Sequence, residues 1–389
     1  MARLGDLIGQ IRGVSYKPSD LRDTLNDNSV ILLRANNVQD GKIMLDDVLY
    51  ISKSKVNESQ YLRQGDILVC TSSGSKELVG KAAFVDEDLP VVFGAFCKVV
   101  RPKIECCKYV GYFFQSPYYR NHISAASAGA NINNLRNEHI ADLYIPLPPI
   151  DEQRKIAAVL DKISDLIAKR RQQLDKLDEL VKSRFIELFG DPTTNPRAWK
   201  TKPLLDMGYC KNGMNFHTGD SGMEMHCLGV GDFKDLSVID GTEQLPIVSL
   251  NEAPPEESML KDGDVVFVRS NGNKALVGRC LVVYPRNTPT TYSGFCIRYR
   301  LTSSEVDTAY LLRVLKTDSM RKKMAGRGAN IQNLNQQILA TLDIPLPPIE
   351  LQEQFATFVE QVDKSKLTIQ KSLDELETLK KSRMQEFFG

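Results

Sequence analysis

The chain has 389 residues, of which 42% are hydrophobic and 25% charged, a composition typical of a globular protein with room for two to four domains. Its 50 basic and 49 acidic residues leave a net charge of +1, which excludes a protein that binds nucleic acid through bulk positive charge alone. The sequence lacks an apolar run of the roughly 20 residues that span a bilayer, and residues 1–13 lack the apolar core of a signal peptide. We therefore predict a cytoplasmic protein with no membrane contact, and the scattered cysteines, predicted to be reduced, agree with that compartment.

An internal repeat is the strongest feature of the sequence. YIPLPPI at 144–150 returns as DIPLPPI at 343–349, an offset of 199 residues. With an offset of 198 residues, GDILVCTSSGSKELVGKAAFV at 65–85 aligns with GDVVFVRSNGNKALVGRCLVV at 263–283. The dipeptides Phe96-Cys97 and Phe295-Cys296 also correspond. These colinear matches predict two copies of one fold. The first residues of each copy match poorly, which predicts that the copies are not functionally identical.

Each copy is predicted to consist of a globular part with strands and helices, followed by one long helix. In the first copy the patterns predict strands at 66–70 and 78–85 and a helix at 110–123. In the second they predict strands at 265–268 and 276–283 and a helix at 307–324. Turn formers at 190–199 mark the boundary between the copies. The predicted domains are a first globular domain at 1–149, a first long helix at 150–190, a second globular domain at 191–348 and a second long helix at 349–389.

The two long helices carry matching apolar stripes. Residues 151–189 contain neither Gly nor Pro, and a helix over 151–188 would be about 57 Å long. Positions that step by three and four, as in a coiled coil, are Gln153, Ile156, Leu160, Ile163, Ile167, Arg170, Leu174, Leu177, Val181, Arg184 and Leu188, and in the second copy Phe355, Val359, Val362, Ile369, Leu373, Leu376 and Phe387. Because neither stripe can stay exposed, we predict that the helices pair within the chain. The alternative is that each packs only on its own globular part.

Signatures of catalysis are missing from the sequence. GSKELVGKA at 74–82 has the wrong glycine spacing for a phosphate loop and lacks its hydroxyl residue. Gly229-Val230-Gly231 lacks the third glycine of a dinucleotide fingerprint. The paired prolines do not stand in the tetrapeptide of an adenine methyltransferase, and the four histidines lack metal-ligand spacing. We therefore predict no catalytic residue, no metal site, and a chain that binds something twice.

Two polar segments recur in both copies and suit DNA. Asn and Gln amides match adenine edges, Arg and Lys match guanine edges, and hydroxyls and backbone amides match phosphate. The candidate DNA-binding residues are Ser72, Ser73, Ser75, Lys76, Asn131, Asn133 and Asn134 in the first copy, and Arg269, Ser270, Asn271, Asn273, Lys274, Asn330, Gln332 and Asn333 in the second. Basic residues at 98–108 and, more densely, at 298–327 would add positive charge. The alternative is that GANINN and GANIQN are structural turns whose Asn side chains cap the next helix.

The helix-start and helix-end sequences carry a family resemblance. IPLPPIDEQRKIAAVLDKISDLI at 145–167, its copy IPLPPIELQEQFATFVEQVDKS at 344–365, and KSRFIELFGDP at 182–192 are highly specific. With the order of globular part, long helix, globular part and long helix, the chain resembles the specificity subunit of type I restriction–modification systems over its whole length. The one departure is Leu351, which interrupts the Glu-Gln pair at the start of the second helix.

The resemblance implies an α+β fold: two similar mixed α/β target-recognition domains, related by a pseudo-twofold repeat and separated by two long helices that form an intramolecular antiparallel coiled coil. Each domain would read one half of a bipartite, asymmetric target in double-stranded DNA. The helices would set the spacing and dock two methyltransferase (modification) subunits, with restriction/translocase subunits as further partners. S-adenosylmethionine, ATP and Mg are implied in those partner subunits, so this non-catalytic chain would hold no cofactor.

Two other functions fit the sequence less well. The chain could be the specificity portion of a methyltransferase–nuclease whose catalytic parts lie outside it. A pure oligomerisation scaffold would leave the two globular domains unexplained.

Overall fold

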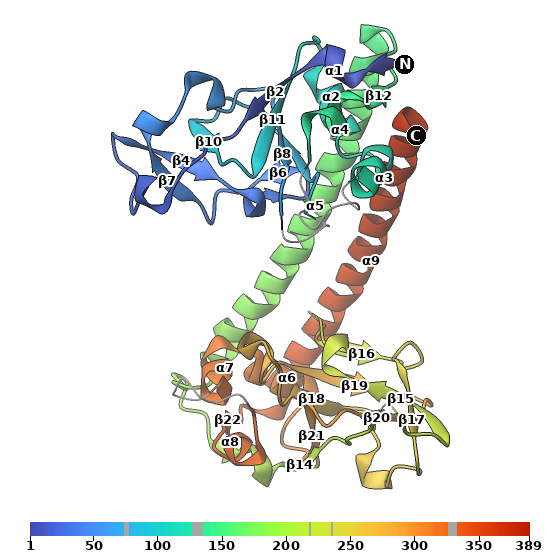
Figure 1. Ribbon diagram of the computed structural model, residues 1–389. Coiled ribbons are helices and arrows are strands. Elements are labelled where there is room, and N and C mark those ends of the chain that lie inside the picture. The colour runs from blue at the N-terminus through green and yellow to red at the C-terminus, as the bar shows by residue number, and fades with distance from the viewer. Residues whose placement is uncertain (74–77, 127–134, 218, 235, 326–332) are drawn as a thin grey trace. The chain divides into compact units, whose positions relative to one another are not determined.

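The computed structural model describes residues 1–73, 78–126, 135–217, 219–234, 236–325 and 333–389. Its contacts divide the chain into two compact units (Figure 1). The first unit combines Met1–Gln173 with Ile369–Gly389, and the second is Leu174–Thr368. Both boundaries fall inside the long helices α5 (Ile150–Phe189) and α9 (Ile349–Phe388). Each unit therefore contains one globular part and portions of both helices. The domain bounds drawn from the sequence follow the helix ends instead and stay a prediction.

Two four-stranded sheets form the globular part of the first unit. One is antiparallel with the order β2-β11-β8-β9, and the other has the order β10-β4-β7-β3, with β10 parallel to β4. The strands are β1 (Ala2–Arg3), β2 (Ile8–Arg12), β3 (Leu21–Arg22), β4 (Ser29–Leu33), β5 (Val38–Gln39), β6 (Lys42–Ile43), β7 (Leu49–Ser52), β8 (Ile67–Cys70), β9 (Ala82–Phe84), β10 (Val91–Phe93), β11 (Cys97–Pro102) and β12 (Tyr144–Ile145). The shorter helices are α1 (Leu4–Leu7), α2 (Cys107–Phe113), α3 (Pro117–Ala126) and α4 (Asn137–Ala141).

The second unit repeats this plan with different edges. A five-stranded sheet has the order β14-β21-β18-β19-β16, and a three-stranded sheet has the order β17-β15-β20. The strands are β13 (Thr201–Pro203), β14 (Gly208–Asn212), β15 (Met223–Leu228), β16 (Val238–Asp240), β17 (Ile247–Leu250), β18 (Asp264–Val268), β19 (Cys280–Tyr284), β20 (Thr290–Tyr292), β21 (Cys296–Leu301) and β22 (Asp343–Pro345). The shorter helices are α6 (Thr308–Lys316), α7 (Asp318–Ala325) and α8 (Gln336–Ala340).

The central strands are apolar on both faces because each face covers a different core. Along β18, Val265 and Phe267 pack in a core with the helices, while Val266 and Val268 pack in a second core with Tyr292 of β20. The residues of β8 alternate in the same way between two cores of the first unit. Such alternation follows from the two-residue period of a strand. The predicted repeat of one mixed fold is thus confirmed.

Each predicted short helix is in fact two helices. The single helices predicted at 110–123 and 307–324 are wrong. The helix is interrupted between Phe113 and Pro117 in the first unit and at Thr317 in the second. Thr317 has an extended backbone, and its Oγ1 accepts the amide of Met320 at 3.4 Å. Ser116 Oγ accepts the amide of Tyr119 at 3.2 Å in the same way. A hydroxyl that caps a new helix start favours this break over a continuous helix.

The start of each long helix is held by a tyrosine and a glutamine. Tyr109 donates its hydroxyl to the carbonyl of Pro146 at 2.8 Å, and Gln153 donates its side-chain amide to the carbonyl of Pro148 at 2.8 Å. In the second unit Tyr310 and Gln352 make the same two bonds to Pro345 and Pro347, both at 2.9 Å. Because Gln352 keeps the position of Gln153, the substitution at Leu351 leaves this arrangement intact.

The long helices run antiparallel within each unit (Figure 1). In the first unit Leu160 shares a core with Phe388, and further along α5 Arg171 pairs with Glu377 at 2.8 Å. In the second unit Asp178 pairs with Lys366 at 2.7 Å, and Phe185 packs on Phe355 with ring centroids 5.6 Å apart. In both units residue numbers rise along α5 as they fall along α9, which confirms the antiparallel pairing. The alternative, that each helix packs only on its own globular part, is wrong because Phe388 packs on Tyr109, 5.1 Å between centroids.

The last turns of the helices depart from the predicted stripe. Arg184 and Leu188 were expected inward, but Phe185 and Phe189 are the buried residues, at 2% and 3% exposure. On α9 the expected Phe387 is half-buried, while Met384 and Phe388 are buried. An α-helix drifts relative to a 3.5-residue repeat. In its last turn each helix therefore packs a different row of residues against the globular part.

We predict that truncating Phe388 destabilises the first unit selectively. Phe388→Ala leaves a cavity in the core of the first unit. A buried Phe→Ala substitution typically lowers the free energy of unfolding by about 3–5 kcal/mol. Hydrogen exchange at the amides of β8 and β11 should accelerate more than at β18 and β21. Leu379→Ala, at a position 42% exposed on the same helix, should leave exchange unchanged. Equal acceleration in both units would contradict the assignment of Phe388 to the first core.

Candidate functional site

In the second unit, three segments meet where β18 ends. The backbone amides of Arg269 and Ser270 both donate to the carbonyl of Phe295, at 2.8 and 3.3 Å. The carbonyl of Arg269 accepts the amide of Leu334 at 2.8 Å, and Ser270 forms a β-bridge with Asn333. The polar turn after β18 is thereby joined both to the turn before β21 and to the end of the Asn-rich segment.

The first unit has the same arrangement after β8. The amides of Thr71 and Ser72 donate to the carbonyl of Phe96 at 2.8 and 3.2 Å, and the Thr71 hydroxyl donates to it at 3.0 Å. The carbonyl of Thr71 accepts the amide of Leu135 at 2.7 Å. In both units the strand end that leads into the polar turn is therefore hydrogen-bonded to the leucine that follows the Asn-rich segment in the sequence, Leu135 or Leu334.

The structure describes eight of the candidate DNA-binding residues. Those described are Ser72, Ser73, Arg269, Ser270, Asn271, Asn273, Lys274 and Asn333. Those outside the described residues are Ser75, Lys76, Asn131, Asn133, Asn134, Asn330 and Gln332. Their roles in DNA binding stay a prediction.

Hydrogen bonds inside the turn at 269–274 commit several of its side-chain groups. Asn271 Oδ1 accepts the amide of Asn273 at 2.8 Å, and Asn273 Oδ1 accepts the amide of Ala275 at 3.0 Å. Arg269 donates a guanidinium N–H to the carbonyl of Gly294 at 3.2 Å. Successive asparagine turns of this kind fix the backbone of a short loop. The carbonyl oxygens of both amides and one N–H of Arg269 are thus used to shape the turn.

A buried aspartate that the sequence did not single out lies at the start of the strand that leads into the turn in the second unit, and directly before that strand in the first. Asp264, whose side chain is 1% exposed, accepts two guanidinium N–H bonds from Arg300 at 2.8 and 2.7 Å and the amide of Lys261 at 2.7 Å. Asp66 does the same with Arg101, both at 2.7 Å, and with the amide of Arg63 at 2.9 Å. The hydrogen bonds to these aspartates raise the pKa of Arg101 and Arg300. The Gly-Asp dipeptide repeated at 65–66 and 263–264 is the sequence signal from which the buried aspartate could have been predicted.

Several basic residues that the sequence suggested as surface charges are buried or paired in the structure. Arg298 is fully buried, with its guanidinium 5.0 Å from the ring centroid of Tyr209, and Lys98 is buried against Gln10 and Asn137. Burial lowers the pKa of Lys98. The guanidinium of Arg300 is paired with the carboxylate of Asp264. The interpretation of these positions as surface charge available to phosphate is therefore wrong.

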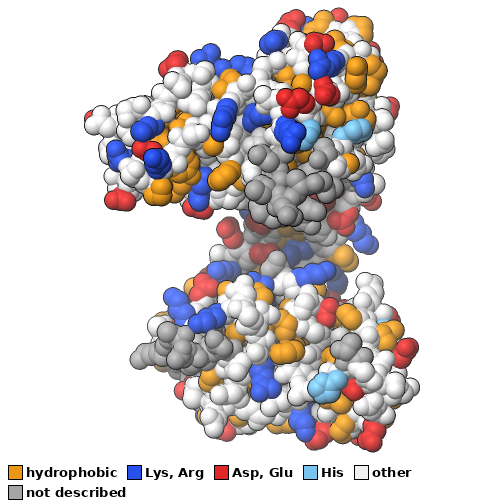
Figure 2. Space-filling model, in the orientation of Figure 1, with side chains coloured by type: hydrophobic (Ala, Val, Ile, Leu, Met, Phe, Trp, Pro, Cys, Tyr) orange, Lys and Arg blue, Asp and Glu red, His pale blue; other side chains and the backbone are white. Residues whose placement is uncertain are grey.

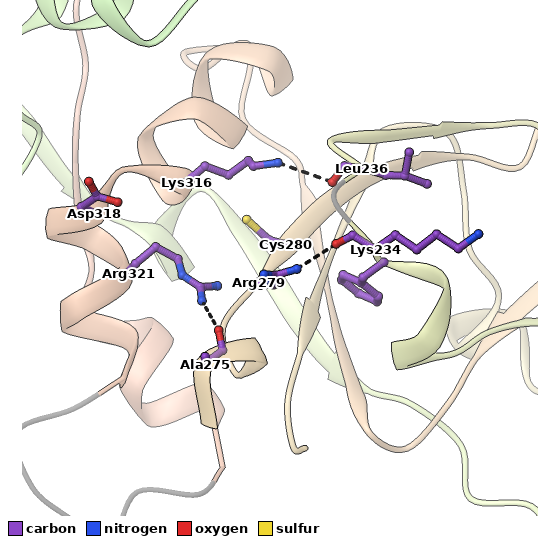
Figure 3. Close-up of a pocket in the computed structure, with 9 residues that line it drawn as sticks. Lys234, Leu236, Ala275, Arg279, Cys280, Lys316, Asp318 and Arg321 are labelled. Atoms are coloured by element: carbon purple, nitrogen blue, oxygen red, sulfur yellow. Dashed lines mark hydrogen bonds between the residues drawn. The ribbon is translucent and has the colours of Figure 1, made fainter. Parts of the chain in front are cut away.

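A cavity of about 260 Å³ in the second unit is lined by basic residues (Figure 3). Lys316 donates to the carbonyl of Leu236 at 3.4 Å, Arg279 to the carbonyl of Lys234 at 2.9 Å, and Arg321 to the carbonyl of Ala275 at 3.0 Å. Burial lowers the pKa of Lys316 and of Arg321. These cations connect α6 and α7 with the segments beside β19, and Arg321 supports the end of the polar turn.

The thiols are not poised for nucleophilic chemistry. All eight cysteines are free, as predicted. Burial raises the pKa of Cys227 and Cys296 to about 12 and that of Cys280 to about 11. Because the thiolate is the reactive form, these thiols stay protonated and inert near neutral pH.

The described residues contain neither a cluster of metal-ligating side chains nor a helix that could span a membrane. Across these ranges, His, Cys, Asp and Glu side chains do not gather in a group of three or more that could hold a metal ion. The helices there are all too short or too polar to cross a membrane. In the face shown by Figure 2, basic and acidic side chains are interspersed over both units.

The chain is similar to known proteins along most of its length. The family model described as "Type I restriction modification DNA specificity domain" matches residues 2–179 and 248–378. The StySPI specificity subunit of the type I restriction enzyme from Salmonella potsdam is 32% identical over 385 residues, covering 94% of this chain and 82% of that one. The EcoKI specificity subunit from Escherichia coli K12 is 30% identical over 392 residues, with the same coverage of 94% and 82%.

Solved structures share the fold. The crystal structure of the S subunit from M. genitalium superposes with a TM-score of 0.56 at 14% identity, covering 100% of this chain and 95% of that one. A structure from work on the assembly and conformational transition of the type I R-M system gives a TM-score of 0.55 at 19% identity and covers 98% of each chain.

We predict that the buried ion pair contributes far more to stability than a surface pair. Arg300→Ala removes both guanidinium hydrogen bonds to the buried Asp264 and leaves only Arg298, 3.9 Å away, as a nearby cation, which should cost about 3–5 kcal/mol. The matched control is Arg286→Ala, whose partner Asp240 is 63% exposed, and it should cost about 0–1 kcal/mol. Urea unfolding followed by the fluorescence of the single tryptophan, Trp199 in the second unit, measures both variants. Equal losses in the free energy of unfolding would show that the buried pair contributes no more than the surface pair.

Proposed function

Because this chain belongs to the family of type I restriction–modification specificity proteins, we propose that it is the DNA sequence-specificity subunit of a type I restriction–modification complex. Each unit reads one half of a bipartite, asymmetric target in double-stranded DNA. The long helices set the spacing between the half-sites and dock the modification subunits. The chain contributes recognition and leaves catalysis to its partners.

The observation that carries this proposal is a backbone junction beside the polar turn that occurs in both units. The end of the central strand is hydrogen-bonded to the leucine that follows the Asn-rich segment in the sequence, through Thr71 and Leu135 or through Arg269 and Leu334. Amide and hydroxyl side chains held on a rigid strand end can bond base edges and phosphates. Two such junctions of similar build but different residues suit two different half-sites.

The near-neutral charge is consistent with a subunit that does not hold DNA alone. Affinity for DNA comes largely from cations that neutralise phosphates. With a net charge of +1, this chain supports sequence readout, and the modification subunits supply part of the phosphate contacts. The proposed partners are two methyltransferase subunits and restriction/translocase subunits in the cytoplasm. S-adenosylmethionine, ATP and Mg act in those subunits.

The purified chain alone should transfer no methyl group to DNA from S-adenosylmethionine. The reason is that the methyltransferase chemistry is assigned to the modification subunits. Incorporation of labelled methyl groups measures this, and addition of the modification subunits should restore activity on the same DNA. Methylation by the chain alone would overturn the division of labour.

In the turn at 269–274, loss of a base contact should affect one half-site only, whereas loss of a phosphate contact should lower affinity for every sequence. Asn271→Ala removes a base contact worth about 1–3 kcal/mol. Lys274→Ala should weaken binding to all sequences and reduce the salt slope of log K by about 1. Binding titrations at several salt concentrations separate the two effects, with Lys364→Ala on the exposed face of α9 as the control. Unchanged binding at every salt concentration would show that the turn is only structural.

Shortening both helices by one heptad should shorten the unread spacer. Deleting Leu174–Leu180 together with Leu367–Leu373 removes about 10.5 Å of paired helix, or about three base pairs of DNA. The stripe stays in phase, so the protein should fold, whereas a four-residue deletion in one helix should break the register and destabilise it. Methylation-site mapping with the modification subunits gives the spacer. An unchanged spacer in a folded double deletant would show that the helices do not set it.

A further inference from the structure

Two phenylalanines stand out from all the others by their exposure. Among the 15 phenylalanines, all of which lie in the described ranges, Phe96 and Phe295 are the ones classed as exposed, at 65% and 61%. They occupy equivalent positions of the repeat, and the residue after each, Cys97 or Cys296, is buried in a strand. Single exposed apolar residues are common on protein surfaces. The same residue exposed at the same place in both copies needs a specific cause.

The backbone beneath each phenylalanine is held firmly. The carbonyl of each accepts two successive amides of the polar turn, as described above for Phe96 and Phe295. A glycine also packs closely against the turn that carries each phenylalanine: a Cβ on Gly13 would lie 2.1 Å from the carbonyl oxygen of Gly94, and one on Gly213 would lie 2.0 Å from that of Ser293. Both approaches leave no room for a side chain. Each ring is thus presented from a fixed point beside the polar turn.

We propose that Phe96 and Phe295 each place an aromatic ring against a nucleobase of the half-site that its unit reads. This inference rests on the proposed function and adds an apolar contact to the polar ones. An aromatic ring can contact the methyl group of thymine in the major groove, or stack on a base where the base step opens. The first mode uses the methyl group on the edge of the base and the second its flat π face, and both surfaces are apolar.

The surroundings of the rings favour DNA over a protein partner. The backbone partners of Phe96 are Thr71 and Ser72, and those of Phe295 are Arg269 and Ser270, which forms a bridge with Asn333. Hot spots of protein interfaces lie in well-packed pockets, usually among other apolar groups. A single ring among hydroxyl and amide groups instead matches a duplex, where apolar base faces and methyls alternate with hydrogen-bonding edges.

The test uses the full chain assembled with its modification subunits and the duplex that the wild-type assembly selects from a random-sequence library. Phe295→Ala should weaken binding of that duplex by about 5- to 150-fold and relax sequence preference in one half-site only, and Phe96→Ala should do so in the other. Phe295→Trp, which keeps an aromatic face, should retain most of the affinity. The matched controls are Ile247→Ala in the second unit and Leu25→Ala in the first, at positions 57% and 55% exposed, and both should bind as wild type does.

Two modified duplexes distinguish the modes of contact. If the ring touches a thymine methyl, replacing thymine by uracil should reproduce the loss and have no further effect on the alanine variant. If the ring stacks on an opened step, 2-aminopurine fluorescence should rise on binding of wild type and not of the variant. Either result supports the proposal.

Other outcomes overturn the inference. Alanine variants that bind and select as wild type does would make the rings simple surface residues. Variants that lose the modification subunits while the chain keeps its DNA affinity would assign the rings to a protein interface. Failure of the wild-type assembly to select any sequence would remove the proposed function itself, which separates that failure from failure of this inference.

Discussion

The aromatic residues in the last turn of each long helix are the contact on which the rest of the structure depends. Phe388 packs on Tyr109 and Phe113 of the first unit, with ring centroids 5.1 and 5.9 Å apart. Phe189 packs on Tyr310 and Phe355 of the second, at 4.8 and 5.5 Å. Each core is therefore completed by a helix that begins at the other globular part of the sequence. A helix that both units need cannot slide or detach without exposing one of these cores.

The same tyrosines connect this packing to the start of the helices. Tyr109 and Tyr310 hold the carbonyls of Pro146 and Pro345, so the proline motif, the helix start and the aromatic end of the other helix meet at one point in each unit. This explains physically why the most similar sequences in the two copies lie at the helix ends. The sheet edges are free to differ: β16 lengthens the main sheet of the second unit, and β3 extends the second sheet of the first. A constant frame with variable edges is suited to reading two different half-sites.

The repeat and the heptad pattern predicted the two copies, the pairing of the long helices and the central strands, while the family resemblance supplied the fold class and the antiparallel direction of the pair. They could not predict the last turns of the helices, because the seam drifts by one residue and the inward face changes from Leu188 to Phe189. They also failed at Thr317, where one capping hydroxyl breaks a pattern that reads as continuous helix.

For the candidate site, the sequence identified the polar segments but not their contact, which depends on long-range backbone bonds such as Leu334 to Arg269. Charge counting was least informative. Arg298 and Arg300 look like surface cations in the sequence, yet one is buried against Tyr209 and the other binds Asp264. Whether a side chain on a strand is buried depends on which core covers its face of the sheet, and the composition of the chain does not show this.

Methylation-site mapping in cells with and without this gene, alongside its modification subunits, shows whether the two units read two half-sites. Adenine methylation at one bipartite, asymmetric motif should appear only when the gene is present, with two specified halves separated by a fixed unread spacer. Methylation that is the same in both strains, or a motif that is continuous or palindromic, would contradict two units that read two different half-sites.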